Sequence, residues 1–149
     1  MPLQFLSPIH RATRQIGIYM ESRSAEFGVP PSEAHLLTYL LSYGPCPVGE
    51  LHRVFGLKRS TLTSMLDRME RRGWIDRHVL LSDRRSFLVD LTPDGRSLAD
   101  RLRDLIEAFE KRVMQEVDSQ ALAGFQAVMQ AIGEVTRVTI RPDHQEESS

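Results

Sequence analysis

Apolar residues recur at steps of three and four along most of the chain, which is the spacing of helices that bury one face. Past Gly73 the pattern changes to an alternation of apolar and polar residues, which is typical of half-buried strands. The pattern therefore predicts six helices and one pair of strands. The predicted helices run from Ile9 to about Phe27, from Ser32 to Gly44, from about Val48 to Phe55, from Gly56 to Gly73, from Thr92 through Val117, and from Asp118 or Ser119 to Val135.

Prolines, glycines and hydroxyl side chains mark the ends of these helices. Pro30 and Pro31 stop the first helical pattern, because proline lacks the N–H group that a helix interior needs. Ser32 is then the expected N-cap of the second helix. Thr92 and Pro93 fit the N-cap and the first position of the long fifth helix.

The third and fourth predicted helices form the outline of a helix-turn-helix. Gly56 lies between them and can adopt the left-handed conformation of a tight turn. The fourth helix has one narrow apolar stripe, formed by Leu62, Met65, Leu66 and Met69. Its opposite face bears polar and basic side chains, those of Arg59, Ser60, Thr61, Ser64 and Arg68.

The alternating segment predicts a β-hairpin with a basic tip. Its two apolar runs are Ile75, Val79 and Leu81, and Phe87, Val89 and Leu91. The polar residues 82–86 between them are the expected turn. The predicted fold class is mainly α with a small β-hairpin, namely a winged helix-turn-helix with flanking helices that form a dimerisation region. The expected parts are an N-terminal dimerisation helix over 1–30, the winged domain over 31–92, C-terminal dimerisation helices over 93–140 and a disordered tail over 141–149.

Net charge alone argues against a nucleic-acid partner, but its distribution reverses that conclusion. The 149 residues hold 19 Lys and Arg against 20 Asp and Glu, a formal net charge of −1. From Arg53 to Arg85 there are nine cations and four anions, a balance of +5, which leaves −6 on the rest of the chain. Binding to phosphate requires cations only on the contacting face. The plainer alternative is a solvated helix face with ion pairs such as Asp67 with Arg71.

Composition excludes several other classes of protein. No apolar run approaches the ~20 residues that cross a membrane, and the N-terminus lacks the features of a secretory signal, so we expect a cytoplasmic protein. No phosphate-binding loop, nucleophile elbow or zinc-protease motif is present, and the histidines show no ligand spacing. The sequence therefore predicts no enzyme activity, no cofactor and no metal.

The order of these elements and several short motifs resemble the MarR family (multiple antibiotic resistance regulators), from about Ile9 to Val138. The matching segments are Glu50-Leu51, Ser60-Thr61-Leu62-Thr63, residues 66–75 (LDRMERRGWI), Asp83-Arg84-Arg85 and residues 91–95 (LTPDG). Lys58 departs from the family pattern, which commonly places a small capping residue there. Because lysine cannot accept hydrogen bonds from the free N–H groups of the next turn, that helix start is suited to a phosphate.

The resemblance implies a homodimeric repressor that binds a pseudo-palindromic operator in double-stranded DNA. In the major groove we expect Arg59, Ser60, Thr61 and Ser64 to reach base edges, although Ser60 and Thr61 can instead complete the helix start. Arg68 would meet the DNA backbone, and Arg77 would either meet phosphate or pack across its strand. On the wing, Arg85 would reach the minor groove or its phosphate edges, and Asp83 would hold that arginine or a neighbouring helix in place by an ion pair. The expected DNA-binding residues are Lys58, Arg59, Ser60, Thr61, Ser64, Arg68, Arg77, Asp83, Arg84 and Arg85.

The resemblance also implies a cavity for a small aromatic or phenolic effector, commonly an anion, between the dimerisation helices and the winged domain. Its candidate lining residues, which can equally be ordinary core or interface residues, are Arg14, Tyr19, His35, Tyr39 and Tyr43. Two alternatives remain open. One is a winged-helix module that binds protein and not DNA, and the other is a redox-responsive regulator that uses Cys46, the only cysteine, although we expect an inert thiol in a loop there.

Overall fold

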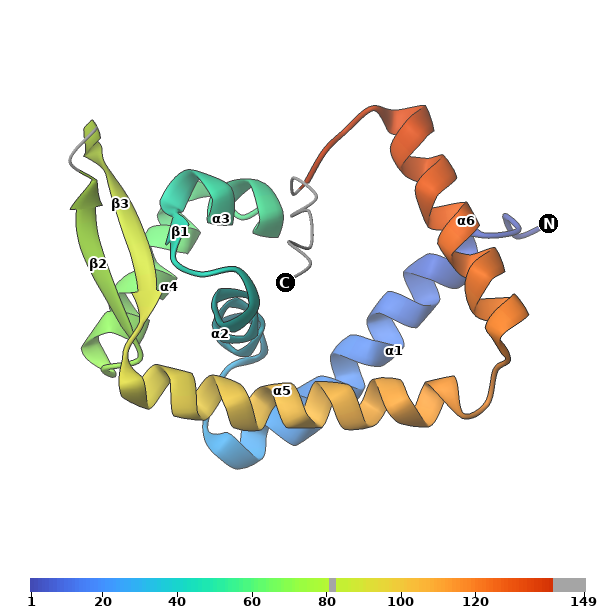
Figure 1. The fold of residues 1–149 in the computed structure, drawn as a ribbon, viewed down its shortest axis with the longest axis horizontal. Helices are drawn as coiled ribbons and strands as arrows, with labels where there is room; N and C mark the ends of the chain where they lie inside the picture. Colours follow the sequence, from blue (N-terminus) through green and yellow to red (C-terminus); the bar gives the residue numbers. More distant parts are fainter. Residues whose placement is uncertain (81–82, 141–149) are drawn as a thin grey trace, which may run out of the picture.

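The winged helix-turn-helix predicted by the sequence is present in the computed structural model, which describes residues 1–80 and 83–140, with side chains left undescribed for residues 80–86. Figure 1 shows the winged unit at one end of the molecule and the flanking helices at the other, with one long helix running between them. The helices are α1 (Leu6–Ser24), η1 (Ala25–Phe27), α2 (Pro31–Tyr43), α3 (Val48–Phe55), α4 (Arg59–Arg71), α5 (Pro93–Met114) and α6 (Ser119–Thr136). The strands are β1 (Cys46–Pro47), β2 (Ile75–Leu80) and β3 (Asp83–Leu91).

The core lies between α2, α3, α4, the sheet and the first turns of α5. Leu36, Leu37 and Leu40 of α2 are at most 1% exposed, and Leu51 of α3 is fully buried. The sheet contributes Ile75, Val89 and Leu91, and α5 contributes Leu98, Ala99 and Leu102. The burial of these branched side chains supplies most of the stabilisation of the winged unit.

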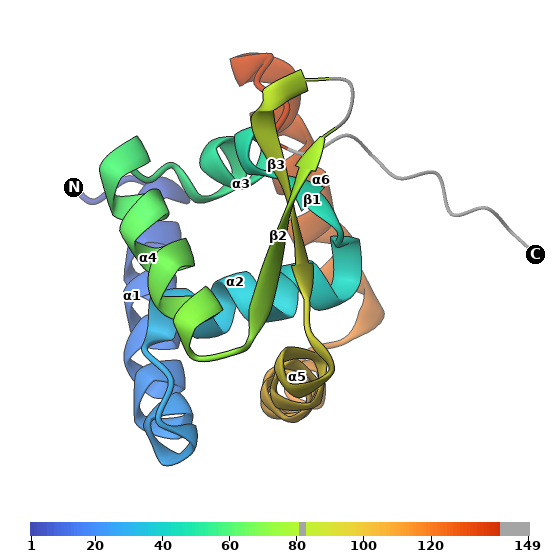
Figure 2. The same ribbon diagram turned by 90° about the vertical axis from the view of Figure 1, so that its left-hand side faces the viewer.

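The sheet has three antiparallel strands in the order β1-β3-β2, so it has one strand more than the predicted hairpin. The sequence analysis placed Cys46 in a loop, but Cys46 pairs with Val89 and Pro47 with Leu88. The expected turn over residues 82–86 was also too long, because β3 begins at Asp83. Figure 2 shows the hairpin extending past α3, with α4 beside β2.

Helix boundaries follow the expected signals with two exceptions. Thr92 accepts a hydrogen bond from Gly95 N at 3.0 Å, and Asp118 accepts one from Ala121 N at 2.7 Å, so both are N-caps. Ser32 is not an N-cap, because Pro30 occupies that position and Pro31 is the first helical residue. Helix α5 ends at Met114, so the expected extension through Val117 was wrong.

Two further expectations concern the C-terminal tail and membrane-spanning helices. The predicted disordered tail, residues 141–149, lies outside the described residues. Within the described part of the chain, every helix is too short or too polar to cross a membrane.

The wing is joined to α5 by a close approach between two backbones. Thr92 N donates to Trp74 O at 3.0 Å, and Thr92 Oγ1 donates to Gly73 O at 2.5 Å. A Cβ atom added to Gly95 would overlap the carbonyl oxygen of Trp74. Glycine is therefore required at position 95 because there is no space for a side chain.

We expect Gly95→Ala to lower the free energy of unfolding by about 1–3 kcal/mol, the usual cost of overpacking. Urea denaturation measures this change. Gly17→Ala is the matched control, because Gly17 lies within α1 with open space around its Cβ position. That substitution should be neutral or stabilise by up to about 1 kcal/mol. Equal stability of the two variants would contradict the steric account.

Candidate nucleic-acid interface

Helix α4 buries one face and leaves the other open. Leu62, Met65, Leu66 and Met69 are each at most 2% exposed. The five residues expected to meet DNA at the start of this helix are all exposed, namely Lys58, Arg59, Ser60, Thr61 and Ser64. Because four buried side chains fix the rotation of the helix about its axis, this polar face is held toward the outside.

The start of α4 has no side-chain cap. Lys58 occupies the N-cap position with extended backbone angles, and none of the described side chains accepts a hydrogen bond from the first-turn N–H groups. The expectation that Lys58 leaves these groups uncapped is confirmed, and the alternative role of Ser60 or Thr61 as caps finds no support. Free N–H groups at a helix start, beside the side chains of Lys58 and Arg59, are suited to a phosphate anion.

Arg77 ties the wing to α4. Its Nε donates to Glu70 Oε2 at 2.5 Å and its Nη2 donates to Asp67 Oδ1 at 2.7 Å. The hydrogen bond to Glu70 contributes most to raising the pKa of Arg77. Of the two expected roles, the structure supports packing within the fold more than phosphate contact. The alternative pairing of Asp67 with Arg71 was wrong, because Asp67 bonds to Arg77.

Of the remaining residues expected to contact DNA, the structure describes the side chain of Arg68 but not those of the three wing residues. Arg68 lies on α4 with its Nε 3.9 Å from Glu33 Oε1, and half of its side chain is exposed. The wing residues Asp83, Arg84 and Arg85 belong to β3 by backbone. Their side chains lie outside the described part of the structure, so their expected roles stay predictions.

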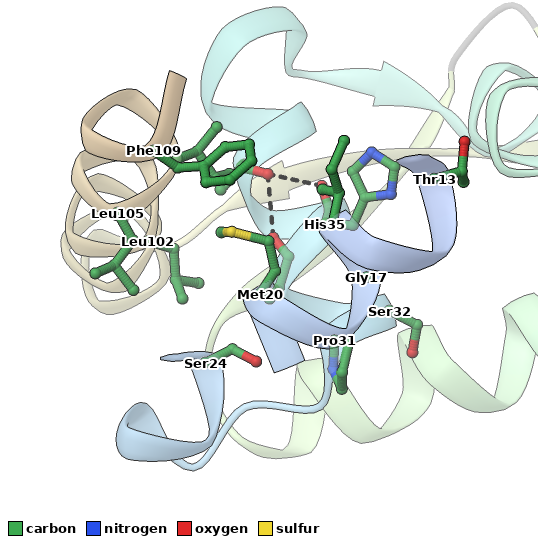
Figure 3. Close-up of a pocket in the computed structure, with 14 residues that line it drawn as sticks. Thr13, Gly17, Met20, Ser24, Pro31, Ser32, His35, Leu102, Leu105 and Phe109 are labelled. Atoms are coloured by element: carbon green, nitrogen blue, oxygen red, sulfur yellow. Dashed lines mark hydrogen bonds between the residues drawn. The ribbon is translucent and has the colours of Figure 1, made fainter. Parts of the chain in front are cut away.

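A hollow of about 470 Å³ opens between α1, α2 and α5 (Figure 3). Its wall is largely apolar, with Ile16 and Met20 from α1 and Leu105 and Phe109 from α5. The hydroxyl of Thr38 donates to the carbonyl groups of Ala34 and His35. His35 is the titratable residue of this wall, and desolvation lowers its pKa.

The lining of the hollow differs from the expected set of ligand residues. Of the five candidates, His35 lines it, whereas Arg14, Tyr19, Tyr39 and Tyr43 do not. Tyr19 packs against Phe109 with ring centroids 5.1 Å apart, and Tyr39 bonds to Glu50 at 3.3 Å. The sequence analysis missed the lining residues of α1 and α5, because it assigned their helical spacing to dimerisation alone.

Comparisons with known proteins agree with this fold. The family model described as MarR family matches residues 29–87. The chain is 27% identical over 120 residues to an uncharacterised HTH-type transcriptional regulator of Bacillus subtilis, YsmB, which covers 72% of this chain and 82% of that protein. It is 42% identical over 52 residues to the multiple antibiotic resistance protein MarR of Salmonella typhimurium, which covers 35% of this chain and 36% of that protein.

The chain is therefore similar to MarR family proteins over its winged unit. Among solved structures, a MepR–DNA complex of S. aureus matches with a TM-score of 0.78 and 14% identity, over 91% of this chain and 99% of that one. The MarR family segment, residues 29–87, contains the helix-turn-helix, β2 and the beginning of β3.

The cysteine of this chain, Cys46, is fully buried. Cys46 Sγ lies 3.2 Å from Tyr43 O, to which it donates a hydrogen bond. Burial, followed by the nearby carboxylate of Glu50, raises the pKa of the Cys46 thiol to about 12. Because the thiolate is the reactive form, this environment opposes oxidation and does not favour the redox alternative.

The described residues also hold no cluster of three or more His, Cys, Asp or Glu side chains that could bind a metal.

We expect Cys46 in the folded protein to react with iodoacetamide at pH 8 at least about a hundred-fold more slowly than in denaturant. Since the thiol ionises near 9.0 when unfolded and near 12 when folded, stability should fall as pH rises through that interval. Cys46→Ala removes this contribution and is the control for the pH series. Rapid alkylation of the native protein would revive a redox role.

Proposed function

We propose that this chain is a homodimeric transcriptional regulator of the MarR type that binds double-stranded DNA through the N-terminal half of α4 and through the wing. The exposed polar face of α4, with its uncapped and basic start, supports the proposal most directly. The similarity to MepR, which was solved as a DNA complex, fits the same use of the fold. The chain acts as a regulator and not as an enzyme, and it works in the cytoplasm.

The dimer is proposed from the flanking helices. Helix α6 has no buried residue, and its apolar side chains are exposed: Phe125 is 57% exposed and Val128 is 38% exposed. Val113 and Met114 at the end of α5 are likewise exposed. A second copy can cover these surfaces symmetrically. Residues 1–30 and 93–140 would then form the dimerisation region, and residues 31–92 would form the DNA-binding domain.

A two-fold dimer would place two copies of α4 about one DNA turn apart, about 34 Å, and would recognise a pseudo-palindromic operator. Repression follows most simply, because an operator that overlaps a promoter needs only to be occupied. A winged-helix module that binds protein is the second candidate. Binding to the chain's own upstream DNA across several salt concentrations separates the two, because only a DNA regulator shows sequence preference together with a steep salt dependence.

Arg59→Ala and Arg85→Ala should each weaken operator binding by about ten-fold or more, the usual cost of losing a specific arginine contact. Gel-shift titration on the upstream fragment measures the loss, and size-exclusion chromatography checks that the dimer persists. Arg96→Ala removes the same charge from an exposed position in the first turn of α5, away from the apolar residues exposed at the end of that helix, and is the matched control. If both variants bound the operator with wild-type affinity, the assignment of α4 and the wing to the DNA interface would be contradicted.

We further propose that the hollow between α1, α2 and α5 takes a small aromatic effector that lowers DNA affinity. Because His35 has a lowered pKa and the wall is apolar, an uncharged ligand fits better than an anion. The effector would act by changing the separation of the two α4 helices, since both half-sites must be met together.

In a thermal-shift assay, 1-naphthol should stabilise the protein more than 1-naphthoate at equal concentration, because burying the carboxylate costs more. Gly17→Leu should abolish the shift, since Gly17 lines the hollow with open space at its Cβ position. The naphthol should also release operator DNA from the wild-type protein. Stronger stabilisation by the anion, or binding without release of DNA, would count against this effector site.

A further inference from the structure

The carboxylate of Glu33 is buried in an unusual position. Glu33 is the third residue of α2 and is 0% exposed, and neither of its oxygens has a hydrogen-bond partner among the described residues. A glutamate at this position commonly accepts a hydrogen bond from the N-cap N–H group. Here the N-cap is Pro30, which has no N–H. The local helix therefore cannot satisfy this side chain.

The counter-charge for Glu33 comes from α4. Arg68 Nε lies 3.9 Å from Glu33 Oε1, where the arginine side chain is 47% exposed and the glutamate side chain is 1% exposed. A buried charge that loses its partner is strongly destabilising. The pair therefore links the first turn of α2 to the second half of α4, in addition to the apolar stripe that packs α4 on the core.

We infer that Arg68 is a positioning residue for α4 and not a phosphate contact. Its guanidinium compensates Glu33 and fixes how far α4 lies along α2, which places Arg59 and the helix start for DNA. This inference rests on the proposed function and revises the expectation that Arg68 meets the DNA backbone. A phosphate would have to share the guanidinium with a carboxylate that is 1% exposed and has no other cation near it among the described residues.

The two roles predict different salt dependence. Loss of a phosphate contact reduces the slope of log affinity against log salt by about one, whereas loss of a positioning residue lowers affinity without changing that slope. We expect Arg68→Gln to weaken operator binding with the slope of the wild type. Arg59→Gln on the same helix is the matched control and should reduce the slope or relax base preference.

A double-mutant cycle tests the link to Glu33. Arg68→Gln alone leaves a buried carboxylate uncompensated and should lower Tm, whereas adding Glu33→Gln removes that charge and should recover most of the Tm and of the operator affinity. Arg68→Lys keeps the positive charge and should retain part of the Tm and part of the operator affinity.

The outcomes separate this inference from the proposed function. A slope reduced by about one in Arg68→Gln, with no recovery on adding Glu33→Gln, would make Arg68 a phosphate contact and overturn the inference. Absence of operator binding by the wild-type protein at low salt would instead overturn the proposed function. In that case the Tm cycle still decides whether the two residues are coupled, since additive effects of the two substitutions would show that they are not.

Discussion

Helix α4 has to be held firmly by one side so that its other side stays free. Four side chains, Leu62, Met65, Leu66 and Met69, provide this attachment, and all four are nearly inaccessible to solvent. Their i, i+3, i+4 and i+7 spacing confines them to a narrow stripe, so the rotation of the helix is fixed while its opposite face stays polar. The core, the sheet and the adjoining helix α3 are arranged around this stripe.

An apolar stripe fixes rotation better than it fixes position along the helix axis, because apolar contacts are not directional. Charged pairs add direction at two points. Arg77 of β2 bonds to Asp67 and Glu70, which ties the wing to α4, and Glu33 of α2 pairs with Arg68. The first turn of α2 also forms part of the wall of the hollow through Pro31, Ser32 and Ala34. Any displacement of that turn therefore acts on the pair with α4.

Local features were predictable from the sequence, and features that join distant segments were not. The stripe of α4, the turn at Gly56 and the N-cap at Thr92 follow from spacing and from residue type, and all three are present. Strand β1 has only two residues, too few for an alternating pattern to show. The partners of Arg77 and Arg68 were missed because both pairs join separate elements. The residues of α1 and α5 that line the hollow were missed, because residues that face a hollow and residues that face a partner helix have the same spacing.

The pairings also change where the positive charge of the winged unit is available. Counting charges from Arg53 to Arg85 gives a basic segment, but Arg77 is neutralised by carboxylates of α4 and Arg68 faces a carboxylate from α2. Arg72 lies over the ring of Trp74, and Arg53 bonds to the carbonyl group of Ile140. Among the described side chains, Arg71 at the end of α4 is also exposed, but the charge left for an anion at the start of that helix is that of Lys58 and Arg59. These two residues flank the uncapped N–H groups, so side-chain charge and helix dipole act on the same point of a bound phosphate backbone.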